Sequence, residues 1–355
     1  MSTNKSIKNP NVSTLGAVNK PKILYLPTSG HTAEVFPPEI FRRFQEQFDV
    51  TLNETGSSYT SDQIAEHVAG FEGIVTGWGV SPITEKVMAN ADALRIIAHS
   101  AGSIKRLVGE VLNKYILPRQ ICVFSANEAI AYNVAEYTIG AMIMTTRRWV
   151  DFILHTRSGK WNRSEVASRA PSLRGSTVGI VSASKVGRQV IQLLQSFEVR
   201  KLIYDPYLSD WEAGNLGVEK VSLNDLFATA DIVTVHTPSI PETDKMIGEE
   251  QLKLLRDGTT LVNTSRGSVI DHDALLAEAR TGRIFITLDV TTPEPLPPDS
   301  PFLGLPNVFV TPHVSGTGVY GYTKIGESTL AALEDFFADR PVVGAVDFNR
   351  FDLIG

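Results

Sequence analysis

Three ionisable residues in the second half of the chain are the strongest candidates for chemistry: Arg266, Glu294 and His313. Each follows an apolar run with the composition of a buried strand, and ligands of open α/β sheets bind at the carboxyl ends of strands. We therefore expect a cation, a carboxylate and an imidazole to meet in one crevice. Oxidation of an alcohol beside a carboxylate needs such a set: a fixed cation, a base, and a group that tunes the base.

The elements that would position these residues alternate between strand-like and helical segments. Strands are expected at residues 23–26, 73–76, 95–98, 121–124, 178–181, 202–204, 232–235, 260–262, 285–288 and 308–310. Helices are expected at residues 38–48, 83–89, 127–156 and 322–338. Two such β-α-β series in 355 residues predict two doubly wound, parallel-sheet α/β domains of the Rossmann and flavodoxin-like kind around a cleft. A single large sheet is the alternative.

Composition narrows the class of protein. The chain is 43% apolar and 20% charged, which is typical of a soluble globular protein, and its net charge of 33 − 39 = −6 argues against a nucleic-acid surface. No apolar stretch reaches the ~18 residues of a membrane span. The single cysteine, Cys122, excludes an internal disulfide and favours a reducing compartment, so we expect a cytoplasmic protein. Residues 1–22 lack an apolar core and are expected to form a flexible arm; a binding element is the alternative.

A dinucleotide fingerprint would lie in the turn after the strand at residues 178–181. The fingerprint is G-x-G-x-x-G, whereas the chain has Ser182-Ala183-Ser184-Lys185-Val186-Gly187 and keeps only the last glycine. The missing glycines normally make the tight turn and let backbone approach the pyrophosphate. Serine either preserves this turn, with its hydroxyls toward the phosphates, or crowds the cofactor and demands a strained φ. This segment alone does not identify a nucleotide site.

Asp205 ends the next expected strand, 205 − 187 = 18 residues after Gly187 and close to the ~20 of the fingerprint. A carboxylate at this position accepts hydrogen bonds from ribose hydroxyls and repels a 2′-phosphate, which predicts NAD rather than NADP. The alternative is a strand-end turn before Pro206.

The order of these motifs resembles the D-isomer-specific 2-hydroxyacid dehydrogenase family. That family has an Arg in an N-x-x-R-G turn, a Glu five residues after the Asp of L-D-V, and a His after T-P; the counterparts here are Arg266, Asp289 with Glu294, and His313. The similarity runs from about residue 23 to the C-terminus and is weakest before residue 94. It implies an NAD-dependent oxidoreductase acting on a small 2-hydroxy or 2-oxo acid, and a homodimer with residues 133–161 at its interface.

The resemblance also implies a role for each residue. His313 would exchange the hydroxyl proton, Glu294 would orient the imidazole and favour its protonated form, and Arg266 would hold the substrate's carboxylate. The cofactor would contact Ser184, Lys185, Val186, Gly187, Asp205, His236, Thr237, Thr264 and Asp289. Asp289 would face the nicotinamide, with a strand-end cap as its main alternative. No metal is required, and no His or Cys pair has the spacing of metal ligands.

On the substrate side, the family binds carboxylate with backbone amides of a glycine-rich loop. The matching residues here are Ser100, Ala101 and Gly102, with Ser100 in place of a common glycine. His99 is unusual at its position and either touches substrate or merely ends a strand. Trp78 would restrict or stack on the substrate's side chain, or else pack between the domains.

In this family the final helix returns to the first domain, which gives a discontinuous division of the chain. We expect a flexible arm at residues 1–22, a substrate-binding domain at 23–125 plus 318–355, and a dinucleotide-binding domain at 126–317. The competing hypothesis is a nucleotide-sensing or partner-binding relative with little or no turnover, since some members of the family act as transcriptional corepressors. The lost glycines favour that hypothesis, whereas the retained Arg, Glu and His oppose it.

Overall fold

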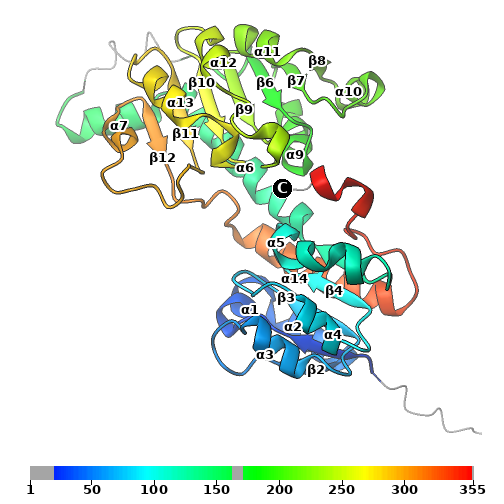
Figure 1. The fold of residues 1–355 in the computed structure, drawn as a ribbon. Coiled ribbons are helices and arrows are strands. Elements are labelled where there is room, and N and C mark those ends of the chain that lie inside the picture. The colour runs from blue at the N-terminus through cyan, green and yellow to red at the C-terminus, as the bar shows by residue number, and fades with distance from the viewer. Residues whose placement is uncertain (1–19, 162–170, 354–355) are drawn as a thin grey trace, which may run out of the picture.

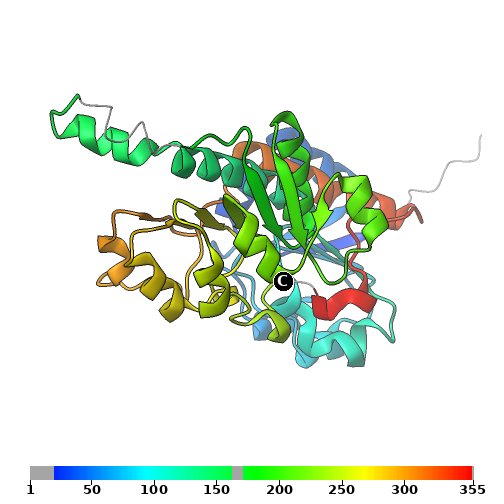
Figure 2. The same cartoon turned by 90° about the horizontal axis from the view of Figure 1, so that it is seen from above.

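The computed structural model describes residues 20–161 and 171–353, which fold around two separate parallel sheets (Figures 1 and 2). This confirms the predicted fold class of two parallel-sheet α/β domains. The predicted arm at residues 1–22 lies outside the described residues except for its last three.

The first sheet has five strands in the order β2-β1-β3-β4-β5. Its strands are β1 (Lys22–Tyr25), β2 (Asp49–Leu52), β3 (Gly73–Thr76), β4 (Ile96–His99) and β5 (Cys122–Ser125). The helices between them are α1 (Ser29–Val35), α2 (Pro38–Gln47), α3 (Ser61–His67), α4 (Glu85–Asn90) and α5 (Lys105–Val108). The register pairs Thr76 with His99 and His99 with Ser125, so β3, β4 and β5 end side by side.

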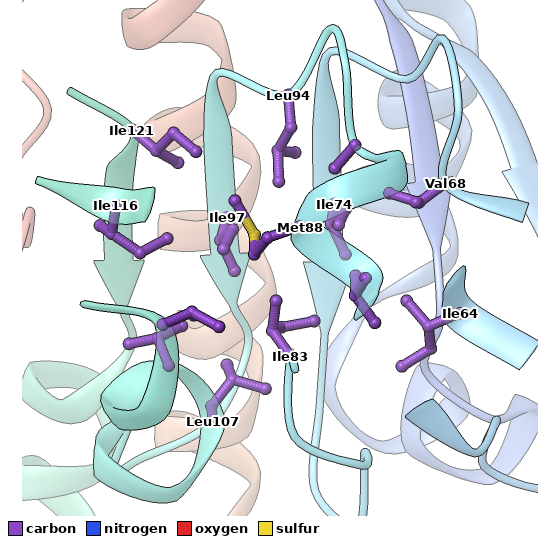
Figure 3. Packing of buried hydrophobic residues seen from close by; sticks show 14 of the residues in the cluster. Ile64, Val68, Ile74, Ile83, Met88, Leu94, Ile97, Leu107, Ile116 and Ile121 are labelled. Atoms are coloured by element: carbon purple, nitrogen blue, oxygen red, sulfur yellow. The ribbon is translucent and has the colours of Figure 1, made fainter. Parts of the chain in front are cut away.

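Both faces of the first sheet are buried, which explains why its central strands are nearly continuous apolar runs. Figure 3 shows one face, where Ile74 and Ile97 of the strands pack against Ile64, Met88 and Leu107 of the covering helices. The last long helix, α14 (Val319–Phe337), covers the opposite face. Its side chains in that core are Ile325, Leu330, Ala332 and Leu333. Each fully buried Ile or Leu stabilises this arrangement by roughly 1.5–3 kcal/mol.

The second sheet has seven strands in the order β12-β11-β10-β9-β6-β7-β8. They are β6 (Thr177–Val181), β7 (Arg200–Tyr204), β8 (Glu219–Lys220), β9 (Ile232–Val235), β10 (Thr260–Asn263), β11 (Phe285–Leu288) and β12 (Val308–Val310). Its helices are α9 (Lys185–Leu193), α10 (Asp210–Leu216), α11 (Leu223–Thr229), α12 (Glu249–Leu254) and α13 (His272–Ala279). The strand order reverses between β6 and β9, and such a switch point opens a crevice at the carboxyl ends of the strands.

The segment between the sheets differs from its prediction. A single helix over residues 127–156 is wrong, because α6 (Asn127–Thr146) ends and α7 (Trp149–Arg157) begins after a break. Arg148 adopts a left-handed conformation with φ 57° at this break, which no helix continues through. As a result, α7 projects away from the body of the molecule (Figure 2). None of the helices in the described ranges is long and apolar enough to cross a lipid bilayer.

Candidate active site

A cleft of about 1170 Å³ lies between the two sheets and is lined by residues of both. The first sheet contributes the loops that follow β3, β4 and β5. The second sheet contributes the loops after β6, β7, β9 and β10 and the loop after β12. The carboxyl ends of two sets of parallel strands therefore face one space, which is where open α/β sheets bind their ligands.

Arg266 lies in this cleft, on the turn that follows β10. Asn263 holds the turn: its Nδ2 donates to the Arg266 carbonyl at 3.0 Å, and its Oδ1 accepts from the Ser265 N–H at 3.0 Å. Burial lowers the pKa of Arg266, and the negative charge of Glu294 opposes that shift. Because a guanidinium in a protein does not lose its proton, the turn presents a permanent cation to the cleft.

His313 and Glu294 form a hydrogen-bonded pair, with Nδ1 of the imidazole 2.5 Å from Oε1 of the carboxylate. They come from the loops after β12 and β11 respectively. The two side chains are 46% and 41% exposed, so a molecule in the cleft can reach the pair. His313 lines the cleft and Glu294 does not. With Nδ1 bonded to Glu294, Nε2 is the ring nitrogen left free for a molecule in the cleft.

Asp289 positions the loop that carries His313. Its buried carboxylate accepts hydrogen bonds from the Thr311 hydroxyl at 2.7 Å, the Val314 N–H at 2.9 Å and the Ser315 N–H at 2.8 Å. Asp289 is absent from the cleft wall. These bonds give Asp289 the strand-end cap that was considered as its alternative role, and its contact with the nicotinamide side stays a prediction.

The loop after β6 makes a tight turn despite its lost glycines. Ser182 has φ 82°, the left-handed region in which a glycine is normally found, and its N–H donates to the Tyr204 carbonyl at 2.8 Å. Gly187 is packed against this turn, because a Cβ there would lie 2.1 Å from the Ser182 carbonyl oxygen. Ser182 thus adopts a strained φ, and Gly187 lets the start of α9 pack closely against the loop after β6.

The N-terminus of α9 fits the phosphates of a dinucleotide. Ser184 caps the helix by accepting from the Gly187 N–H at 3.3 Å. In the described part of the chain, the N–H groups of Ser184, Lys185 and Val186 have no hydrogen-bond acceptor, and all three residues line the cleft. Free amides at a helix N-terminus, with an exposed Lys185 beside them, form an anion site.

Asp205 makes the strand-end turn considered for it from sequence, and its place on the cleft wall leaves ribose binding as a prediction. One of its oxygens, Oδ2, accepts from the Ala183 N–H at 2.8 Å and the Ser182 hydroxyl at 3.3 Å, and Oδ1 accepts from the Tyr207 N–H at 2.8 Å. The last of these bonds is the strand-end turn. A carboxylate has about four acceptor positions, so these three leave one, and Asp205 lines the cleft.

Three further residues predicted to contact the cofactor, His236, Thr237 and Thr264, also line this half of the cleft. The same wall includes the apolar Ile240 and Met246 and the charged Arg188 and Glu242. Burial lowers the pKa of His236 to about 3, and its Nδ1 is buried with no hydrogen-bond partner among the described residues. The Thr264 hydroxyl lies 2.9 Å from that of Thr138 on α6, which fixes its position in the wall.

Only some of the residues predicted to bind the substrate lie on the cleft wall. Trp78 and Gly102 line the cleft, but Ser100 and Ala101 are fully buried and do not. The Ser100 hydroxyl donates to the Thr76 carbonyl at 2.6 Å and so points away from the cleft. In the described ranges, the N–H groups of Gly102 and Ser103 lack acceptors, and both residues line the cleft. Gly102 and Ser103 therefore offer amides to the cleft, and which amides of this loop bind the substrate's carboxylate stays a prediction.

Sequence analysis missed several residues that shape the cleft. They are His31 beneath Trp78, Tyr322 of α14, and Gly344, Asp347 and Arg350 of the C-terminal segment. That segment runs beside β5, because Ser125 donates to the Gly344 carbonyl and Val346 donates to the Val123 carbonyl. No local pattern signals any of these positions. Within residues 20–161 and 171–353, no group of three or more His, Cys, Asp or Glu residues could hold a metal ion.

The fold and this cleft define a two-domain α/β protein with one domain built to bind a dinucleotide. Residues 139–315 match the family model described as D-isomer specific 2-hydroxyacid dehydrogenase, NAD binding domain. A glyoxylate reductase of Korarchaeum cryptofilum is 32% identical over 294 residues, which cover 82% of this chain and 87% of the relative. A D-3-phosphoglycerate dehydrogenase of Methanocaldococcus jannaschii is 31% identical over 262 residues, which cover 73% of this chain and 48% of the relative.

Solved structures agree with these sequence relationships. The TT0316 protein from Thermus thermophilus is similar with a TM-score of 0.74 and 26% identity, covering 92% of this chain and 100% of that one. The apo D-mandelate dehydrogenase of Rhodotorula graminis shares the fold, with a TM-score of 0.78 at 21% identity over 92% of this chain and 98% of that one.

The chain belongs to the D-isomer-specific 2-hydroxyacid dehydrogenase family, and it contains that family's NAD-binding domain. It spans about half the length of the archaeal D-3-phosphoglycerate dehydrogenases that it matches, 48% of one and 56% of another.

Proposed function

We propose that this protein is an NAD-dependent oxidoreductase that transfers a hydride between nicotinamide and a small 2-hydroxy or 2-oxo acid. One observation carries the proposal: the hydrogen-bonded pair of His313 and Glu294 lies in the loops beside Arg266, and His313 and Arg266 line the same cleft as the dinucleotide loop. A proton-exchanging group and a carboxylate anchor are thus available in the space where the cofactor binds.

His313 is the proton-exchanging group in this proposal. Its Nδ1–H donates to Glu294 at 2.5 Å, which fixes the ring and leaves Nε2 for the substrate oxygen. During oxidation Nε2 takes the hydroxyl proton, and during reduction the imidazolium gives a proton to the carbonyl oxygen. Glu294 stabilises the positive charge that the ring carries in one of these two states.

Arg266 is the anchor for the substrate's carboxylate and its neighbouring oxygen. A planar guanidinium with five N–H donors holds two oxygen atoms at once, which orients the reacting carbon. One donor, Nη1, is already bonded to the Ser265 carbonyl at 2.7 Å, which restricts the guanidinium to one side of the turn. The free amides of Gly102 and Ser103 support a second contact with the carboxylate.

The dinucleotide loop would hold NAD by its backbone and two charged side chains. The free amides of Ser184, Lys185 and Val186 and the Lys185 ammonium suit the pyrophosphate, and Asp205 suits a ribose hydroxyl. Gly187 keeps α9 close enough for these contacts. When bound, NAD supplies the hydride acceptor or donor, and the protein supplies orientation and charge.

The assembly and the location of the protein are part of the same proposal. Exposed apolar side chains on the projecting α7 support a homodimer in which residues 133–161 lie at the interface; they are Trp149, Ile153 and Leu154. The packing of α14 on the first sheet supports a substrate domain of residues 23–125 plus 318–355 and a dinucleotide domain of residues 126–317. The single cysteine supports a cytoplasmic location.

The experiment that tests the enzymatic proposal is a titration of NADH fluorescence followed by turnover of a panel of 2-oxo acids. NADH binding with turnover of at least one acid is the expected result. Binding without turnover across the panel would favour the second candidate, a nucleotide-sensing or partner-binding protein, which the serine at φ 82° in the dinucleotide loop supports.

A further inference from the structure

A chain of buried hydrogen bonds connects two histidines behind the substrate wall of the cleft. Nε2 of His31 on α1 lies 2.8 Å from the Ser100 hydroxyl, and that hydroxyl donates to the Thr76 carbonyl at 2.6 Å. The Thr76 hydroxyl lies 2.8 Å from Nδ1 of His99, at the end of β4. Both imidazoles are buried, yet His99 also lines the cleft.

The donors and acceptors available in this series of hydrogen bonds fix the positions of its protons. The Ser100 hydroxyl donates its single proton to the Thr76 carbonyl, so it must accept a hydrogen bond from His31. The proton of the His31 ring therefore lies on Nε2. The Thr76 carbonyl already accepts the Ser100 N–H and hydroxyl, which uses both of its lone pairs.

The same accounting sets the tautomer of His99. Thr76 is completely buried, and among the described residues its hydroxyl has only Nδ1 of His99 as a partner. If Nδ1 carried the proton, the Thr76 hydroxyl would have a buried hydrogen without an acceptor, which costs about 1–3 kcal/mol. The hydroxyl therefore donates to Nδ1, and the His99 proton lies on Nε2.

His99 Nε2–H is left as a donor for the cleft. No described residue accepts a hydrogen bond from this nitrogen, yet it is not among the fully buried atoms without a partner. Because His99 lines the cleft, we infer that its Nε2–H faces the cleft. Burial and the neighbouring His31 lower the pKa of His99 to about 4, which keeps the ring neutral near pH 7. The wall on this side of the cleft combines apolar residues with polar ones and one cation; they are Trp78, Ile104, Leu107, Ser103, Ser125, Asn127 and Arg106.

We propose that His99 is a specificity residue whose Nε2–H donates a hydrogen bond to an oxygen that the substrate carries on the carbon next to its 2-oxo group. This inference rests on the proposed function, in which Arg266 and the amides of Gly102 and Ser103 hold the carboxylate end. His99 precedes those amides by three to four residues and lines the same cleft. Since Arg266 and the amides hold the carboxylate and the reacting carbon, the part of the substrate that His99 would contact is the substituent on carbon 3. The site thus selects 3-oxygenated 2-oxo acids over their unsubstituted analogues.

The first test compares kcat/KM for 3-hydroxypyruvate and pyruvate, which differ by one hydroxyl. The variants are His99→Leu, which removes the donor, and His99→Gln, whose side-chain amide keeps an N–H at a similar distance. The wild type should prefer hydroxypyruvate by about tenfold or more, because a site built to hydrogen-bond a substrate group is left with an unpaired donor by the analogue. His99→Leu should remove most of that preference, and His99→Gln should keep most of it.

Two further variants distinguish a direct contact between His99 and the substrate from the support that neighbouring residues give to His99. Thr76→Val removes the hydroxyl that fixes the tautomer and should reduce the preference in part, whereas His67→Gln, at an exposed histidine on α3, should leave it unchanged. A wild type without preference for hydroxypyruvate, or a preference that survives in His99→Leu, would overturn the inference while leaving the proposed oxidoreductase function intact.

A second measurement does not depend on turnover. In the NADH-bound protein, ¹⁵N NMR of labelled histidine, assigned by the signal lost in His99→Gln, should show the Nε2–H tautomer for His99. Its Nε2 resonance should shift on addition of hydroxypyruvate and not of pyruvate. An Nδ1–H tautomer, or equal responses to the two acids, would contradict the specificity role even if the protein turned over neither acid.

Discussion

Gly267 lies so close to Thr291 that a Cβ on the glycine would be 2.1 Å from the Thr291 carbonyl oxygen. Gly267 follows Arg266 on the turn after β10, and Thr291 precedes Glu294 on the loop after β11. The two loops thus touch through their backbones. This contact sets the spacing between the cation and the carboxylate-imidazole pair without using any side chain.

Substitution of Gly267 by alanine should therefore disturb the site and the fold together. The added methyl group forces the two loops apart, and overpacking of this kind costs about 1–3 kcal/mol. We expect a lower melting temperature and a kcat/KM reduced at least tenfold in Gly267→Ala. The matched control is Gly214→Ala in α10, where a Cβ meets nothing within 4 Å and stability should stay the same or rise. Wild-type activity in Gly267→Ala would show that the contact does not position the site.

The second prediction concerns Ser182, whose φ of 82° strains a residue that carries a Cβ. Ser182→Gly should raise the free energy of unfolding by about 1 kcal/mol, because glycine adopts this conformation without a steric penalty. Denaturant melts measure that change, with Ser184→Gly as the comparison: this variant loses the cap of α9 and should not gain stability.

Calorimetric titration of NADH into the same two variants tests whether the serines obstruct the cofactor. We expect binding that is unchanged or weaker, since the loop already makes its turn and leaves the amides of α9 free. Binding tightened more than about tenfold by the glycines would instead mean that the serines block the pyrophosphate site, and would favour the sensor hypothesis.

Asp205 should determine the preference for NAD over NADP. The carboxylate lines the cleft with one acceptor position free, and it repels a phosphate on the ribose. The ratio of kcat/KM for NADH to that for NADPH should be well above one in the wild type and should fall in Asp205→Asn, which keeps the size of the side chain. A wild type that prefers NADPH, or a ratio that Asp205→Asn leaves unchanged, would contradict this assignment.

The buried histidines should make the protein less stable as the pH falls. Burial lowers the pKa to about 4 in His31 and His99 and to about 3 in His236, below the ~6.5 of an unfolded chain. Below pH ~6.5 the unfolded chain therefore binds protons at these rings that the folded chain does not. Stability is fully present above pH ~6.5 and falls toward pH ~4, by up to about 1.4 kcal/mol per pH unit for each histidine.

Urea unfolding at pH 7.5, 6.5 and 5.5 measures this dependence in the wild type and in His31→Gln. Glutamine keeps an N–H for Ser100 but does not titrate, so the variant should lose less stability between pH 6.5 and 5.5 than the wild type. Equal slopes for the two proteins would mean that His31 is not held neutral in the fold.

The fold was predictable because the strands of a parallel sheet are buried on both faces and so appear as apolar runs. The prediction of helices and strands failed at two places that carry no local signal. The break at Arg148 interrupts the predicted helix without a glycine or proline. The strand β2 was not predicted, because it is partly exposed at the edge of its sheet and so is not an apolar run.

The candidate site was predictable where one motif carries one side chain at the end of one strand, as with Arg266 and His313. It was not predictable where the direction of a side chain depends on distant contacts. Ser100 turns away from the cleft because His31 supplies a donor from 69 residues away in the chain, and Asp289 turns inward because Thr311 and Ser315 supply donors. The Glu294–His313 contact is seen in the structure, whereas the catalytic roles of the two residues stay predictions.

The central claim is that His313 exchanges the proton of the substrate's oxygen while Arg266 anchors its carboxylate. The most direct measurement is single-turnover oxidation of bound NADH by the best 2-oxo acid in wild type, His313→Gln and Arg266→Gln, with the NADH dissociation constant measured in each. We expect His313→Gln to slow the chemical step by roughly 10²–10⁴-fold. Arg266→Gln should raise the acid concentration needed for half-saturation, and NADH binding should change little in either variant. A His313→Gln protein that oxidises NADH at the wild-type rate would contradict the account.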